Sequence, residues 1–149
     1  MYDIGIGEIK CTKRYDDPAG NYIKYDAEAA ERPKVCPYSN CDHTKNMLYK
    51  HSANYSLLKD TRSEGKIVLI NLKIQYYKCA DCFGITVDRF SFFEKGTHVT
   101  NRLREEFVRR CLNGETFSYI ARDYGVDHKT VAKIYHDYYA SIISTESGI

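Results

Sequence analysis

The chain has 149 residues, of which 43% are hydrophobic and 28% charged, and its formal net charge is only +2. The length suits one folded domain or two small ones. The composition excludes a disordered chain. No apolar run approaches the roughly 20 residues that cross a bilayer, so we expect no membrane partner. The first residues, MYDIGIGEIK, lack the basic and apolar regions of a signal peptide, which predicts a cytoplasmic protein with reduced thiols.

The N-terminal segment, residues 1–34, is predicted to form a β-hairpin. Its strand-like pieces, YDIGIGEIKCTKRY and NYIKYDAEA, flank the sequence DDPAG. Asp17, Pro18 and Gly20 are residues that favour turns, so the chain should reverse there.

The middle region, residues 35–96, is predicted to be a small β-module. In IVLINLKIQYYKC, apolar and polar residues alternate, which is the period of a half-buried strand. The alternation places Ile70, Leu72, Ile74 and Tyr76 on one face. YSLLKD before Gly65 and FGITVDRF after the last cysteine pair are the other strand candidates.

Four of the six cysteines form two pairs in this region, Cys36 and Cys41 in CPYSNC and Cys79 and Cys82 in CADC. Zinc takes four such ligands in a tetrahedron, and two turns joined by antiparallel strands can supply them. The sequence therefore predicts a structural Zn²⁺ that supplies much of the folding free energy of a small β-module.

Other interpretations of these cysteines remain open at this point. His43 is close enough to replace Cys41 as a ligand. A disulfide is disfavoured in an intracellular chain, a redox CADC motif needs a βαβ setting, and a catalytic zinc keeps one ligand position open. Cys11 and Cys111 lie far from either pair and are expected to be small core residues.

Residues 97–140 are predicted to form three helices, followed by a flexible tail over residues 141–149. The first helix runs from about Asn101 to Leu112 and stops at Asn-Gly. The second, from Phe117 to Tyr124, has Thr116 as its N-cap, and the third, from His128 to about Tyr139, has Asp127.

The spacing within YIARDYGVDHKTVAKIY is that of a helix-turn-helix. Ala121 is small enough for two crossing helices to touch, and Gly125 tolerates the positive φ of the turn. Val131 and Ile134 then lie on the inner face of the third helix. The outer face near its start carries the predicted DNA contacts, joined by one arginine of the second helix: His128, Lys129, Thr130, Lys133 and Arg122.

A trihelical bundle with the same apolar spacing can also be a protein-interaction domain. The segment 97–140 carries seven Lys or Arg against six Asp or Glu, which gives no strong electrostatic preference for DNA. His136 and Tyr138 are expected to pack or to contact the DNA backbone. Salt-dependent binding to mixed duplex DNA distinguishes the two functions.

The region from Val35 to Ile134 resembles the N-terminal part of bacterial insertion-sequence transposases of the ISL-three type. The resemblance is carried by VCPYSNC, HSANYSLLKD, INLKIQYYKCADCFGITVDRF and THVTNRLREEFVRRCLNGETFSYIARDYGVDHKTVAKI. In that family a zinc-ribbon-like domain precedes a helix-turn-helix and then an RNase H-like catalytic domain. The resemblance implies that the two cysteine pairs hold zinc and that the third helix helps to bind terminal inverted repeats.

These observations predict an α+β protein: a small zinc-bound, zinc ribbon-like β-module with an N-terminal hairpin, followed by a trihelical helix-turn-helix domain. The expected function is sequence-specific binding of double-stranded DNA, either transposon terminal repeats or an operator, by a homo-dimer. We expect a bacterial, transposase-derived protein that is not an enzyme, because no catalytic carboxylate triad is visible. The alternatives are a protein-interaction adaptor with a structural zinc and a small transposase-derived transcriptional regulator.

Overall fold

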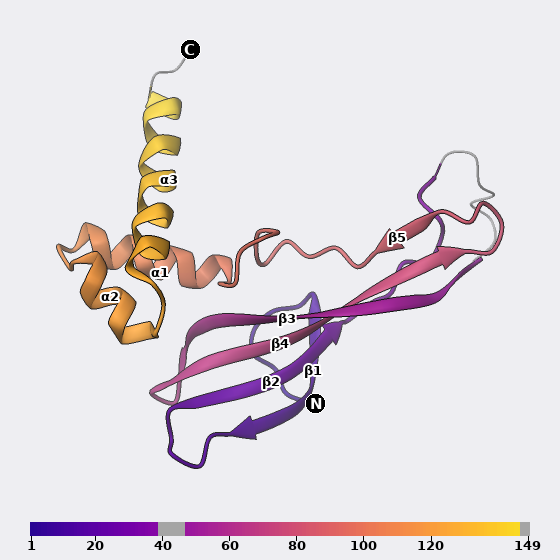
Figure 1. Ribbon diagram of the computed structural model, residues 1–149, viewed down its shortest axis with the longest axis horizontal. Helices are drawn as coiled ribbons and strands as arrows, with labels where there is room; N and C mark the ends of the chain where they lie inside the picture. Colours follow the sequence, from indigo (N-terminus) through magenta and orange to yellow (C-terminus); the bar gives the residue numbers. More distant parts are fainter. Residues whose placement is uncertain (39–46, 147–149) are drawn as a thin grey trace.

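The computed structural model of the protein describes residues 1–38 and 47–146, which form one twisted sheet and three helices (Figure 1). The strands are β1 (Ile9–Asp16), β2 (Tyr22–Ala29), β3 (Leu48–Ser63), β4 (Lys66–Cys79) and β5 (Ile85–Val87). The helices are α1 (Asn101–Leu112), α2 (Phe117–Tyr124) and α3 (His128–Glu146). The structure thus confirms the α+β class, with all strands before the helices.

Strand order in the sheet is β1-β2-β4-β3, and β5 pairs with the end of β4. β1 and β2 form the predicted antiparallel hairpin, and the turn between them is held by the Asp17 carboxylate, which accepts a hydrogen bond from the Asn21 amide at 3.0 Å. β2 then runs parallel to β4, with Ile23 opposite Val68 and Ala27 opposite Leu72. The hairpin and the β3–β4 pair are therefore parts of one sheet.

One face of this sheet carries the first hydrophobic core, which the hairpin and the β3–β4 pair share. The N-terminal residues Ile4 and Ile6 and three phenylalanines of the segment before α1 pack against it. Its buried members are Ile9, Cys11, Ile23, Tyr25, Ala27, Leu58, Val68, Ile70 and Leu72. Cys11 is 1% exposed and belongs to this core, as expected.

β4 buries opposite faces in its two halves. Val68, Ile70 and Leu72 are buried in the first half, whereas Gln75, Tyr77 and Cys79 are buried in the second. The predicted apolar face holds as far as Ile74, which packs against the first core, and is wrong at Tyr76, which is only partly buried while Gln75 and Tyr77 are buried. The reason is that a different part of the chain covers each half, the N-terminal segment the first and the Cys36 segment the second.

The three helices enclose a second core and match the predicted boundaries closely. The side chains of Thr100 and Thr116 cap α1 and α2 by accepting hydrogen bonds from the Leu103 and Tyr119 amides. The buried residues of this core are Val99, Leu103, Phe107, Ile120, Ala121, Tyr124, Val131 and Ile134. Cys111 packs against it in part, as expected. α3 continues beyond the domain as a projecting helix to Glu146, through most of the segment predicted as a tail (Figure 1).

None of the helices in the described part of the chain has the length and apolar character required to span a bilayer.

Candidate nucleic-acid interface and cysteine cluster

The turn between α2 and α3 has the geometry that the sequence spacing predicts. Gly125 adopts the left-handed conformation, with φ of 65°, which a residue with a Cβ rarely adopts. The Val126 amide donates to the Ala121 carbonyl at 2.9 Å, closing the end of α2. Ala121 is 3% exposed and Val131 is fully buried, so both lie at the contact between the helices.

The predicted DNA-contacting residues of α3 lie together at its N-terminal end. The Asp127 carboxylate accepts a hydrogen bond from the Lys129 amide at 2.9 Å and caps the helix. The side chains of His128 and Lys133 are 61% and 78% exposed, and Lys129 is also exposed. Thr130 is half-buried. His128, Lys129 and Lys133 are thus exposed to a ligand at this end of the helix, whereas Thr130 and Lys133 line a hollow toward the sheet.

Acidic groups near this end of α3 moderate its positive charge. The Lys133 Nζ lies 3.2 Å from an Asp137 carboxylate oxygen, and the His128 Nδ1 lies 3.4 Å from Asp127. The Lys133–Asp137 pair is exposed, so it contributes little to stability and Lys133 can exchange this partner for a phosphate. Arg122 is exposed on α2, away from this cluster in sequence, and borders a shallow hollow with Tyr119 and Asp123.

A hollow of about 460 Å³ lies beside the N-terminal half of α3. Thr130 and Lys133 are among the residues that line it from α3, and Leu57 and Lys59 line it from β3. The carboxylates of Glu94, Asp127 and Asp137 also border it. The face of α3 that carries Thr130 therefore borders the sheet, a proximity that the local sequence pattern did not reveal.

Three polar side chains near the end of β3, Lys59, Asp60 and Arg62, hold the helices against the sheet. Lys59 donates from Nζ to the carbonyls of Tyr124 and Gly125, at 2.9 and 2.6 Å. These carbonyls belong to the C-terminal end of α2, where a cation is favourable. Burial lowers the pKa of Lys59, although these carbonyl contacts favour its charged form.

Asp60 and Arg62 complete this attachment. Asp60 is fully buried and accepts hydrogen bonds from the Thr100 hydroxyl, at 2.7 Å, and from the Arg102 guanidinium. Arg62 donates to the Asp123 carboxylate at 2.9 Å, and this hydrogen bond lowers the pKa of Asp123. Sequence analysis missed all three β3 residues because their partners lie 40 or more positions away.

At the other end of the sheet, three of the four predicted metal ligands come together. The Sγ atoms of Cys36, Cys79 and Cys82 all lie within 4.8 Å of one another. Those of Cys36 and Cys82 are 3.6 Å apart, close to the roughly 3.8 Å between sulfurs that share one tetrahedral zinc. The donor set therefore fits a zinc ion. Cys41 and its alternative His43 lie outside the described residues.

The chain around Cys79 and Cys82 forms a tight turn that positions the sulfurs. The Phe83 amide donates to the Cys79 carbonyl at 2.9 Å, and the Gly84 amide lies 3.4 Å from the Cys82 Sγ. A Cβ on Gly84 would come within 2.6 Å of the Tyr38 ring, so any larger residue would displace that ring. Tyr38 in turn donates from its hydroxyl to the Ile85 carbonyl at 2.7 Å.

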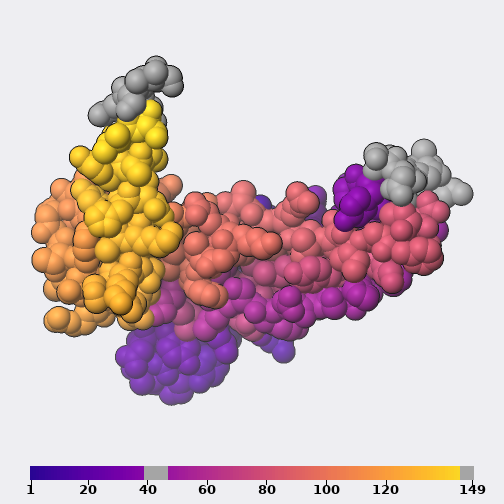
Figure 2. Space-filling model, turned by 45° about the horizontal axis from the view of Figure 1, so that its top comes forward, coloured from indigo at the N-terminus to yellow at the C-terminus, as the bar shows by residue number. Residues whose placement is uncertain are grey.

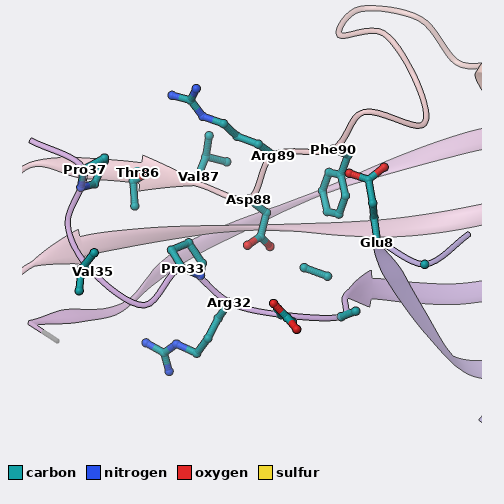
Figure 3. Close-up of a pocket in the computed structure, with 14 residues that line it drawn as sticks. Glu8, Arg32, Pro33, Val35, Pro37, Thr86, Val87, Asp88, Arg89 and Phe90 are labelled. Carbon is teal, nitrogen blue, oxygen red and sulfur yellow. The ribbon is translucent and has the colours of Figure 1, made fainter.

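A larger hollow, of about 770 Å³, lies between residues 29–37 and residues 86–90 (Figure 3). Asp88 projects from the strand side of this hollow, and Arg32 and Pro33 lie opposite it. Asp88 is 8% exposed; one carboxylate oxygen accepts from the Gln75 amide at 3.0 Å, and the other has no hydrogen-bond partner within the described residues. Burial raises the pKa of Asp88. Sequence analysis did not single out this residue.

Comparisons with known proteins bear on the helical part of the chain. No curated protein and no solved structure shows a significant match. Residues 89–139 match the family model described as the helix-turn-helix domain of transposase family ISL3. This match covers α1, α2, the turn and most of α3, and it supports DNA binding by these helices. For the zinc ribbon of that family, the three clustered cysteines are the only support among the described residues. The predicted resemblance is thus confirmed for the helical part of the chain: residues 89–139 match the helix-turn-helix domain of transposase family ISL3.

Proposed function

We propose that the protein binds double-stranded DNA sequence-specifically, with the N-terminal half of α3 in the major groove. The observation that carries this proposal is the α2–α3 turn, in which Gly125 and Ala121 set the crossing that leaves His128, Lys129 and Lys133 exposed. The match of residues 89–139 to a transposase helix-turn-helix supports it. It also makes transposon terminal repeats the first candidate DNA, with an operator sequence as the second.

The exposed side chains of α3 suit two kinds of contact. Lys129 and Lys133 can neutralise phosphates, which gives binding that weakens with salt. His128, Thr130 and Lys133 can reach base edges, where each good contact contributes about 1–3 kcal/mol of discrimination. Arg122 lies on α2, the helix that crosses the backbone in this class of motif, and we assign it to phosphate.

Lys133→Ala tests this assignment. Alanine keeps the helix, and the exposed pair with Asp137 contributes little to stability, so the fold should persist. We expect weaker binding, by about 5-fold to 150-fold if Lys133 contacts a base. Fluorescence anisotropy at several salt concentrations measures it, with Lys34→Ala, an exposed lysine of another segment, as the matched control. Equal affinities of the two variants at every salt concentration would remove Lys133 from the interface.

We further propose that a structural Zn²⁺ is held by Cys36, Cys79 and Cys82, with Cys41 as the fourth ligand and His43 as its alternative. The three clustered sulfurs support this site, and four ligands would close it to substrates. Zinc would stabilise the end of the sheet, where the buried core is only Cys36, Leu48, Tyr77 and Cys79.

Cys79→Ser and Cys82→Ser test the metal site. Each should release zinc and unfold the cysteine end of the sheet, because a hydroxyl binds zinc far less well than a thiolate. Elemental analysis of the purified variants measures bound zinc, and Cys111→Ser, a cysteine packed in the helical core, is the control. Near-stoichiometric zinc in both Cys79→Ser and Cys82→Ser would contradict the site.

We propose that the protein acts as a homo-dimer, because one recognition helix reads few base pairs and two half-sites give a longer footprint. Light scattering of the complex with a duplex that the protein binds measures how many protein chains bind one duplex. A strictly one-to-one complex would contradict dimerisation while leaving DNA binding intact.

A protein-interaction adaptor is the second candidate function, and exposed apolar side chains favour it. Tyr139 and Ile143 are 54% and 46% exposed on the projecting part of α3, and Leu112 is 59% exposed at the end of α1. A small transcriptional regulator would combine such a surface with DNA binding. Absence of binding to mixed duplex DNA, or binding without salt dependence, would favour the adaptor.

A further inference from the structure

The face of the sheet opposite the first hydrophobic core is open in its hairpin half. Figure 1 looks onto this face at the end of the sheet near the helices. The strand registers align its side chains in three rows. Two rows cross all four strands: Lys13, Asp26, Asn71 and Leu57; and Tyr15, Lys24, Leu69 and Lys59. In the third row, Lys10 pairs with Glu28 and Lys73 pairs with Tyr55, one position beyond the pair of Ala27 and Leu72, where the pairing of β2 with β4 ends. We call these twelve residues the lysine face.

Lysines outnumber carboxylates on the lysine face by five to two. Both carboxylates have partners: Glu28 lies 3.4 Å from the Lys10 Nζ, and Asp26 accepts from the Asn71 amide at 3.2 Å. Lys59 is held by the carbonyls at the end of α2. Within residues 1–38 and 47–146, the remaining lysines of this face, Lys13, Lys24 and Lys73, form no ion pair. Lys73 shares a hollow with the Asp88 carboxylate, which attracts it without a direct contact.

Exposed rings and apolar side chains lie between these lysines. Tyr15 is 48% exposed, Tyr55 is 65% exposed and Leu57 is 49% exposed, so no other segment of the described chain covers them. The Lys24 Nζ lies 5.6 Å from the centre of the Tyr15 ring. Lysine stems that pack on such rings keep their charged ends in solvent, where a large anion can reach them.

The lysine face is continuous with the proposed recognition helix. Leu57 and Lys59, at the β3 end of two of its rows, line the same hollow as Thr130 and Lys133 of α3. In Figures 1 and 2 the hairpin and the helices lie toward the same end of the elongated molecule. A ligand seated on the start of α3 therefore meets the edge of the lysine face first.

We propose that the lysine face is a second contact surface for the same DNA duplex, one that binds the phosphate backbone beside the site read by α3. This inference rests on the proposed DNA-binding function and names a further part of its interface. The occupant is DNA rather than a protein because three unpaired cations complement a polyanion and the face adjoins α3.

The dimensions of the face suit a backbone contact. Four strands at a spacing of about 4.8 Å span about 14 Å, and three rows separated by two residues span about 13 Å. About 13 Å of duplex axis carries roughly seven or eight phosphate charges, more than enough for three lysines. Sequence selectivity is not expected from this face, since phosphate contacts position a protein without reading bases.

The test is a triple variant of the full chain, Lys13→Gln, Lys24→Gln and Lys73→Gln, which removes charge from exposed or half-buried positions without removing the side-chain stems. Its control is a second triple variant, Lys34→Gln, Lys50→Gln and Lys78→Gln, which has the same change in charge. Lys50 and Lys78 lie near the cysteine end of the sheet, opposite Tyr77 and Ile85 on the neighbouring strands. Thermal melting with each variant's circular dichroism spectrum verifies that both fold. Anisotropy with one fixed duplex between about 50 and 200 mM salt then gives affinity and salt slope.

We expect the triple variant to lose about 10-fold or more in affinity and to lower the salt slope by roughly 2–3, since each phosphate contact contributes about 0.9. The control variant should show a smaller change in both affinity and salt slope, because it loses the same net charge at positions away from the proposed contact surface. Equal affinities and slopes for the triple variant and its control overturn the lysine face, while a weakened Lys133→Ala variant in the same assay would leave the function of α3 standing. If the unmodified protein binds no DNA at any salt concentration, the proposed function and this inference both fail.

Discussion

Asp88 has a buried carboxylate that is only partly hydrogen-bonded. It continues the pairing of β5 with β4, because its amide donates to the Gln75 carbonyl at 3.0 Å and its carboxylate accepts from the Gln75 amide. The other carboxylate oxygen is buried without a hydrogen-bond partner among the described residues. A buried oxygen without a partner destabilises the native state by about 1–3 kcal/mol.

The Asp88→Asn variant should have a free energy of unfolding about 1 kcal/mol higher than that of the wild type at pH 7. Asparagine keeps the acceptor for Gln75 and removes the buried charge. Because burial raises the pKa of Asp88, its favourable, protonated state is populated at low pH and is lost as the pH rises through that raised value. The advantage of asparagine should therefore shrink toward pH 4.

Urea denaturation at pH 7 and pH 4 measures this difference. Glu31→Gln, at an exposed residue of the same hollow, should change the free energy of unfolding little at either pH. A loss of stability at pH 7 in Asp88→Asn, larger than in Glu31→Gln, would show instead that the ionised carboxylate makes a favourable interaction.

Residues whose roles depend on local spacing could be predicted, and residues with distant partners could not. Gly125 and Ala121 were identified because the turn and the helix crossing involve neighbours in sequence. Lys59 and Asp88 carry no local signal, since their partners are Tyr124 and Gln75, reached only after the sheet and the helices have folded. The metal ligands are intermediate: spacing indicated the pairs, and the structure places three of the four sulfurs together.

At the level of elements, the attachment of β3 to the α2–α3 turn makes the sheet part of the helical domain. The Lys59 amide donates to the His98 carbonyl at 2.8 Å, and the Thr100 amide donates to the Lys59 carbonyl at 3.0 Å. The Lys59 side chain then reaches the end of α2. β3 thus fixes both the start of α1 and the turn before α3.

Lys59→Met should destabilise the protein by about 1.5–3 kcal/mol, because methionine keeps the stem but leaves the Tyr124 and Gly125 carbonyls without their charged donor. The free energy of unfolding in urea is the measurement. Lys50→Met, at an exposed lysine on the same strand, is the matched control. Two variants of equal stability would show that the Lys59 contact contributes nothing to the attachment.

Element boundaries followed from local signals much better than strand pairing did. The predicted bounds of α1 and α2 agree with the structure because caps and terminal glycine signals are encoded in adjacent residues. The predicted end of α3, near Tyr139, is too early, since SIISTE has low intrinsic helix propensity yet continues the helix to Glu146. The parallel pairing of β2 with β4 cannot be predicted from either strand, because alternating apolar and polar residues do not specify the partner strand.

On the scale of the whole molecule, two long strands separate the proposed functions. β3 and β4 have 16 and 14 residues, and a strand of 14 residues spans about 46 Å. The cysteine cluster lies at one end of this pair and the helix-turn-helix at the other (Figure 1). Zinc would therefore stabilise the sheet far from the DNA-contacting helix, and its loss should affect DNA binding only through the lysine face and the attachment of β3.

The most direct test of the central claim is selection of bound duplexes from a random pool with the full chain. The account predicts enrichment of one motif, and Lys133→Ala should bind that motif less tightly while binding scrambled duplexes almost as the wild type does. A pool that stays random through successive rounds, with salt-independent retention, would contradict the claim that α3 reads double-stranded DNA.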